Sequence, residues 1–126
     1  MERRKYKGFR DLIVYQKSYK LALEIFEITK TFPKEEKFLL VDQMRRSSRS
    51  VPANIAEGWA KRKYPKSFVS KLIDALGEEA ETEVWLDMSK DLEYIDKETH
   101  SRLINEYTEV AKMLNSMINN PEKFCY

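Results

Sequence analysis

The 126-residue chain has little cysteine, glycine or proline, and each shortage excludes a class of structure. It contains one cysteine, three glycines and four prolines. A lone cysteine, Cys125, cannot form an internal disulfide, which favours a reducing cytoplasm as the location. So few glycines and prolines leave little material for hairpin turns. No apolar run approaches the about 18 residues that predict a membrane-spanning helix. Residues 1–12 also lack the apolar segment of a secretory signal.

Histidine is equally scarce, and this removes most catalytic hypotheses. His100 is the only histidine, and no glutamate precedes it by three residues, whereas di-iron sites in helical bundles need Glu-x-x-His pairs. No serine lies in a nucleophile motif, and Cys125 has only His100 as a possible base. Phosphate-binding glycine loops and zinc-ligand clusters are absent. We therefore expect a protein that is not an enzyme and that has neither a metal site nor a cofactor.

Helical periodicity, in contrast, fills most of the chain. Apolar residues recur at steps of three and four in four long segments separated by short breaks. The segments are expected from Asp11, as N-cap, to Phe32-Pro33; from about Lys34 to Lys61; from Pro65 or Ser67 to the loop at 93–96; and from the cap Asp96 to Asn119. This pattern predicts an all-α fold, an antiparallel up-down-up-down four-helix bundle over residues 11–120. A basic N-terminal arm (1–10) precedes it and a C-terminal tail (121–126) follows.

The second segment contains an unusual stretch, SVPANIAEG, at residues 50–58. Pro52 either begins a new helix capped by Ser50 or bends one continuous helix, and we favour the single bent helix. Asn54 is then expected to bond groups that the bend frees. Gly58 is expected to let a neighbouring helix or subunit approach closely. Glu57 is expected to pair with an arginine, Arg46 or Arg62, on another element or another subunit.

The third segment places carboxylates among its apolar positions. Glu79 and Glu83 share the stripe of Leu72, Leu76 and Leu86, so some of these acids should point inward. A buried carboxylate needs a cation or hydrogen-bond donors. The alternative is a solvated acidic face with one or two inward members. The candidate cations are Arg45, Arg46, Arg49 and Arg62.

The net charge of +2 hides an uneven distribution of charge along the chain. Residues 1–10 carry a net +4 and residues 45–71 a net +7, whereas residues 72–126 carry a net −8. Clusters of Lys and Arg neutralise phosphates and are typical of nucleic-acid binding, although such runs are also common on solvated helix faces. Tyr6 and Tyr64 lie within the clusters, where they could stack on unpaired bases. The candidate phosphate-binding residues are Arg45, Arg46, Arg49, Lys61, Arg62, Lys63 and Lys66.

Five groups of residues over roughly positions 9–95 form a recognisable combination. They are Arg46, SVPANIAEG at 50–58 and Arg62; FRDLIVYQK at 9–17; FPKEE at 32–36; QMRR at 43–46; and Gly77, Glu81, Glu83 and Leu86. Together they resemble a family of four-helix bundles encoded in intervening sequences of bacterial 23S ribosomal RNA genes, also called S23 ribosomal protein. The chain departs from the family pattern at Ser47, Glu78 and Thr82, where Ala, Ser and Leu are usual.

The resemblance implies a homo-oligomer, typically a pentamer, without an established enzymatic activity and with RNA or DNA as a partner. Our leading hypothesis is therefore a non-enzymatic, homo-oligomeric bundle that binds nucleic acid through its basic clusters. The alternative is an oligomeric scaffold or protein-partner module, in which basic and acidic surfaces only pair subunits head to tail. A metal or small-molecule enzyme would need an unexpected pocket.

Overall fold

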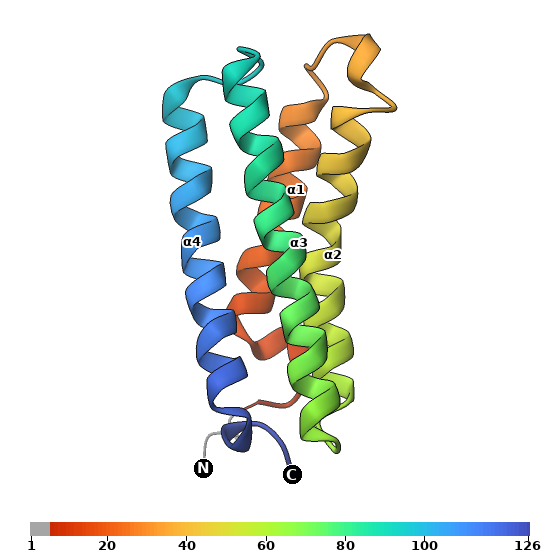
Figure 1. Cartoon of the computed structure of the whole chain (residues 1–126), viewed down its shortest axis with the longest axis vertical. Helices are drawn as coiled ribbons and strands as arrows, with labels where there is room; N and C mark the ends of the chain where they lie inside the picture. The colour runs from red at the N-terminus through yellow and green to blue at the C-terminus, as the bar shows by residue number, and fades with distance from the viewer. Residues whose placement is uncertain (1–5) are drawn as a thin grey trace.

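The fold is that of a computed structural model, in which residues 6–126 are described. Within this range the chain is all-helical and has no strand, as the sequence predicts. Consecutive long helices are joined at alternate ends of the bundle, so the chain runs up and down (Figure 1). The four long helices are α1 (Ile13–Thr29), α2 (Leu40–Ala60), α3 (Pro65–Asp91) and α4 (Lys97–Asn119); the short 3-10 turns are η2 (Phe9–Asp11), η3 (Lys34–Glu36) and η4 (Pro121–Lys123).

Local sequence signals explain most of the helix ends. The Asp96 carboxylate accepts a hydrogen bond from the Thr99 backbone N–H at 2.7 Å, which confirms Asp96 as the cap of α4. Pro65 is the first residue of α3, where its missing donor costs nothing. Asp11 does not cap α1, and that expectation was wrong. Its carboxylate instead accepts from the backbone N–H groups of Lys7 and Gly8, which closes the turn η2.

The second helix is continuous through Pro52, as predicted, but it begins later than the sequence suggests. Residues 34–36 form the separate turn η3, and α2 begins at Leu40. Pro52 removes the donor that would reach the Ser48 carbonyl. Asn54 does not replace that donor, contrary to expectation. Its side-chain amide donates at 2.8 Å to the Ser50 carbonyl, two residues further along the helix.

All four helices contribute apolar side chains to one core. The α4 face expected from the sequence is buried, including Leu103, Tyr107 and Leu114. The C-terminal segment closes one end of the bundle. There Phe124 is buried, and its ring centroid lies 6.1 Å from those of Phe68 and Tyr6.

The closest backbone approach around a glycine joins α2 to α3. A Cβ atom on Gly58 would lie 3.2 Å from the Lys71 Cβ and 3.4 Å from the Phe68 carbonyl oxygen. Both distances are at or below the usual van der Waals separation, and one of the atoms is backbone. Gly58 therefore allows α3 to pack directly against α2, which confirms its expected role.

Buried hydroxyl groups also cross this α2–α3 interface. The Ser47 and Thr82 side-chain oxygens lie 2.8 Å apart, within hydrogen-bonding distance, and both residues are fully buried. Further along the same interface, the Ser89 hydroxyl lies 3.3 Å from the Met44 sulfur. Buried polar groups destabilise a core unless they are paired, so these pairs fix which faces of the two helices meet.

We predict that the Ser47–Thr82 contact is energetically coupled. Ser47→Ala or Thr82→Val alone should lower the unfolding free energy by about 1 kcal/mol, because the remaining hydroxyl loses a buried partner. The loss of unfolding free energy in the double variant should be smaller than the sum of the two single losses, by at least about 0.5 kcal/mol. Urea unfolding of the four proteins measures this coupling.

The control cycle combines Thr82→Val with Ser18→Ala. In the wild type, the Ser18 hydroxyl donates to the Tyr15 carbonyl of its own helix. Those two effects should be additive. Additive effects in the Ser47–Thr82 cycle as well would show that this contact does not couple the helices.

Candidate nucleic-acid interface

The two basic clusters predicted from the sequence lie in different surroundings. Arg45 is half-buried against α1, where its Nε donates to the Thr29 hydroxyl at 2.9 Å and its guanidinium lies 4.4 Å from the centre of the Phe26 ring. Arg46 forms ion pairs with Glu78, at 3.2 Å, and with Glu81, both on α3. These two arginines join helices of the same chain, so a phosphate would have to compete with these internal contacts.

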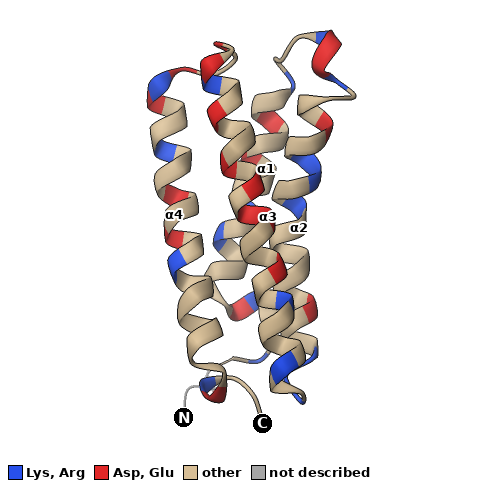
Figure 2. Ribbon diagram, in the orientation of Figure 1, with Lys and Arg blue, Asp and Glu red and all other residues tan. Residues whose placement is uncertain are grey.

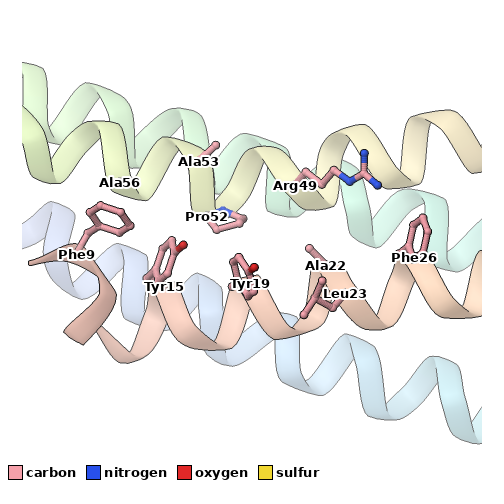
Figure 3. Close-up of a pocket in the computed structure, with 10 residues that line it drawn as sticks. All are labelled: Phe9, Tyr15, Tyr19, Ala22, Leu23, Phe26, Arg49, Pro52, Ala53 and Ala56. Carbon is pink, nitrogen blue, oxygen red and sulfur yellow. The ribbon is translucent and has the colours of Figure 1, made fainter.

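Arg49 is also exposed, like Arg46, but it makes no ion pair with a described carboxylate. Its guanidinium lies 5.8 Å from the Phe26 ring centre. Arg49 borders an apolar groove of about 540 Å³ between α1 and α2 (Figure 3). No sequence pattern predicted this groove. It is lined by Phe9, Tyr15, Tyr19, Ala22, Leu23, Phe26, Arg49, Pro52, Ala53 and Ala56.

The second cluster occupies the turn between α2 and α3 and the first turn of α3. Lys61, Lys63 and Lys66 are exposed and make no ion pair within residues 6–126. Tyr64 stands among them with 62% of its surface exposed. Arg62 differs, because its Nε donates to the Trp59 carbonyl at 2.8 Å and its guanidinium lies 3.7 Å from the Trp59 ring centre. We call Lys61, Lys63, Tyr64 and Lys66 the basic end.

The basic end lies at the same end of the bundle as the C-terminus and the first described residues (Figures 1 and 2). Tyr6 packs there against Trp59, with ring centroids 5.7 Å apart, and against Phe124. Tyr6 is therefore part of the closing apolar layer and is not free to stack on a base, contrary to the expectation from the sequence. Arg3, Arg4 and Lys5 of the N-terminal arm lie outside the described residues.

Glu57 pairs with a lysine on another helix, not with an arginine. Its carboxylate lies 2.9 Å from the Lys71 ammonium of α3, and this contact holds the pKa of Glu57 below its ordinary value. The expected partners, Arg46 and Arg62, are held by α3 acids and by Trp59 respectively. The prediction of a partner on another element was correct, but the residue type was wrong.

The inward-facing acid expected in α3 is Glu79, which is only 2% exposed. None of the candidate arginines reaches it, so the expected charge pairing is wrong. Burial, together with a hydrogen bond to half-buried Glu83, raises the pKa of Glu79 to about 9. One Glu79 carboxylate oxygen and the buried Tyr107 hydroxyl have no hydrogen-bond partner among the described residues. Burial therefore favours the neutral form of Glu79, because no lysine or arginine among residues 6–126 forms an ion pair with its carboxyl group.

Glu81 differs from its buried neighbour. Its carboxylate accepts from the Trp85 indole N–H at 3.1 Å as well as from Arg46. Glu81 therefore ties α3 to α2 at the protein surface.

The described residues contain no assembled catalytic constellation. The His100 ring Nε2 lies 2.8 Å from the Asp87 carboxylate, as an ion-pair or hydrogen-bond partner. Burial raises the pKa of the Cys125 thiol, which is opposite to the shift of an activated nucleophile. Within residues 6–126, no group of three or more His, Cys, Asp or Glu side chains is arranged to hold a metal. No helix in this range has the length and hydrophobicity needed to span a membrane.

The fold and its surfaces define a four-helix-bundle protein with a basic end and an apolar groove. The chain belongs to the family described as 23S rRNA-intervening sequence protein, which matches residues 10–116. It is similar to a crystal structure from Bacteroides thetaiotaomicron VPI-5482, described as a protein of unknown function from the S23 ribosomal protein family. The two share 36% identity and a TM-score of 0.76, over 84% of this chain and 98% of the other. A comparison with curated proteins gives no match.

We predict that Glu79 makes stability fall as pH rises. Its pKa is about 9 in the folded protein, above its ordinary value of 4.5. Between these values the folded chain holds a proton that the unfolded chain releases. The contribution of this proton to the free energy of unfolding is therefore fully present below pH 4.5. It decreases toward pH 9, by at most about 1.4 kcal/mol per pH unit. Glu79→Gln should remove this contribution, since glutamine stays neutral.

Urea unfolding at several pH values between these limits measures the effect. The difference in stability between Glu79→Gln and the wild type should grow in favour of the variant as pH rises. Glu98→Gln, at an exposed position in the first turn of α4, is the control for loss of a surface carboxylate. Parallel pH profiles for the wild type and Glu79→Gln would contradict the prediction.

Proposed function

We propose that this chain is a non-enzymatic, homo-oligomeric protein that binds RNA or DNA through its basic end. The observation that carries the proposal is the set of three lysines, Lys61, Lys63 and Lys66, around exposed Tyr64 without a described ion-pair partner. Each lysine can approach a phosphate without first breaking an ion pair with a described residue; Lys63 contacts only the neighbouring Tyr64 ring, 5.9 Å from its ammonium. Release of condensed counterions then supplies the binding free energy.

Tyr64 adds a contact of another kind. An aromatic ring surrounded by cations offers a stacking surface for an unpaired base, and stacking tolerates any base. The combination favours single-stranded nucleic acid and predicts little sequence preference. The family description, which refers to a 23S rRNA intervening sequence, is consistent with an RNA partner.

The alternative function, an oligomeric scaffold or protein-partner module, is favoured by a different feature. The α1–α2 groove exposes a mostly apolar surface, including half of Tyr19 and more than half of Leu23. Such a surface suits a protein partner better than a phosphate backbone. The two functions use separate surfaces, so experiments can distinguish them.

We predict that binding to a labelled single-stranded RNA, followed by fluorescence anisotropy, weakens steeply between about 50 and 200 mM salt. The triple variant Lys61/Lys63/Lys66→Glu should weaken binding at least about tenfold and flatten the salt dependence, since each lost phosphate contact removes about 0.7 from the slope for single strands. Tyr64→Ala should weaken binding about tenfold with little change in the slope, because stacking releases no counterions.

The matched control is Lys34/Lys37/Lys97→Glu, which makes the same change of charge. Its three exposed lysines lie in η3, directly after η3 and at the start of α4, at the opposite end of the bundle (Figure 2). It should retain the wild-type slope. Light scattering on all variants checks that assembly is unchanged. No binding at the lowest salt, or equal losses in both triple variants, would refute binding at the basic end.

A further inference from the structure

Helix α3 is apolar on two opposite faces. Its core face buries Phe68, Leu72 and Leu86 completely. A second set of small and apolar residues follows spacings of four, three, four and four, which places them in one stripe on the solvent side. We call this the outer stripe: Ile73, Gly77, Ala80, Val84 and Met88.

The outer stripe is exposed in the single chain. Ile73, Val84 and Met88 have 51%, 48% and 46% of their surfaces accessible, and Gly77 and Ala80 are exposed between them. A helix of a globular protein normally carries polar residues on the side that faces water. An apolar strip along the centre of α3 therefore indicates a surface that another element covers.

The α1–α2 groove has the complementary shape. Its walls carry large side chains, including Tyr15, Tyr19 and Phe26, as Figure 3 shows. The centre of the outer stripe is small, and a Cβ atom on Gly77 would meet nothing within 4 Å. Large rings on one surface can therefore pack beside the smallest residues of the other, as ridges fit into grooves between helices.

Charge favours the same pairing. Three exposed acids, Asp74, Asp87 and Asp91, flank the outer stripe at helical spacing, so the rims of the outer stripe are mainly negative. Arg49 is the single charged residue that lines the groove, and it makes no ion pair within the described part of the chain. Opposite charges beside two apolar surfaces help to fix partner and orientation.

We propose that the α1–α2 groove of one copy receives the outer stripe of α3 from a second copy. This inference rests on the proposed homo-oligomeric assembly and assigns the surfaces that form it. The groove and the stripe belong to different helices, so each copy offers one surface of each kind. The contact is therefore heterologous and repeats head to tail, which leads to a closed ring or a filament.

Two variants test the two surfaces separately. Leu23→Glu places a charge in the groove and Ala80→Glu places one in the centre of the stripe; both positions are exposed in the single chain, so the fold should persist. Circular dichroism should show that each variant is helical, and light scattering should give the monomer mass of 15.0 kDa. The wild type should have a larger mass. Asn115→Glu, on the exposed side of α4, is the control and should keep the wild-type mass.

Mixing the two monomeric variants tests the heterologous geometry directly. The Ala80→Glu protein retains an intact groove and the Leu23→Glu protein an intact stripe. The mixture should therefore form a 1:1 complex of twice the 15.0 kDa chain mass and grow no further. A contact between two identical surfaces could not be restored in this way.

The remaining outcomes separate this inference from the proposed function. A wild type with a mass of 15.0 kDa would overturn both assembly and this interface. An assembled wild type whose mass survives both substitutions would overturn the interface and leave assembly standing. Dissociation by Leu23→Glu alone would show that another segment or partner occupies the groove. A mixture that stays monomeric would overturn the groove-to-stripe pairing.

Discussion

The close packing of α2 against α3 is the constraint on which the rest of this structure depends. Gly58 allows the two backbones to approach, the Ser47–Thr82 contact fixes which faces meet, and Arg46 joins α2 to two acids of α3. Once α3 is held in this orientation, its second apolar face must point outward. The same contact occupies Arg46 and leaves the lysines of the connecting turn exposed at the end of the bundle.

Polar side chains make this contact specific. The Ser47 and Thr82 side-chain oxygens lie 2.8 Å from each other, and Glu78 pairs with Arg46. The Thr82 hydroxyl also lies 2.9 Å from the Glu78 carbonyl of its own helix. Because buried polar groups are destabilising without partners, a shift of α3 along α2 would separate these pairs and lower stability.

The sequence predicts the fold well because helical periodicity is a local signal. Repeats of three and four residues identify the four long helices, and the cap Asp96 needs only the neighbouring Thr99. The failures occur where a residue has two possible partners. Asp11 could cap either of two adjacent turns, and it closes the earlier one.

The candidate site was less predictable, for the same physical reason. From composition alone, Arg45, Arg46 and the lysines of the basic end are equally good candidates for phosphate binding. Their availability depends on position: the arginines lie mid-helix between two neighbours, whereas the lysines lie on a connecting turn or directly after it. Glu79 shows the converse limit. Its place in an apolar stripe predicted burial, but no local pattern reveals that a carboxylate will be stabilised by protonation instead of by a cation.

The proposed assembly and the proposed nucleic-acid binding are linked through symmetry. If the groove of each copy receives the stripe of the next and the ring closes, cyclic symmetry relates all copies by rotation about one axis. Every copy of a given bundle end then faces the same side of the ring. The basic ends would form one continuous rim, and a strand held by one subunit would meet the next at high effective concentration. Three lysines and one tyrosine form a small site in a single chain, but repeated around a rim they form an extended one. The apolar surfaces of α1, α2 and α3 would thus determine the affinity of a site that they do not touch.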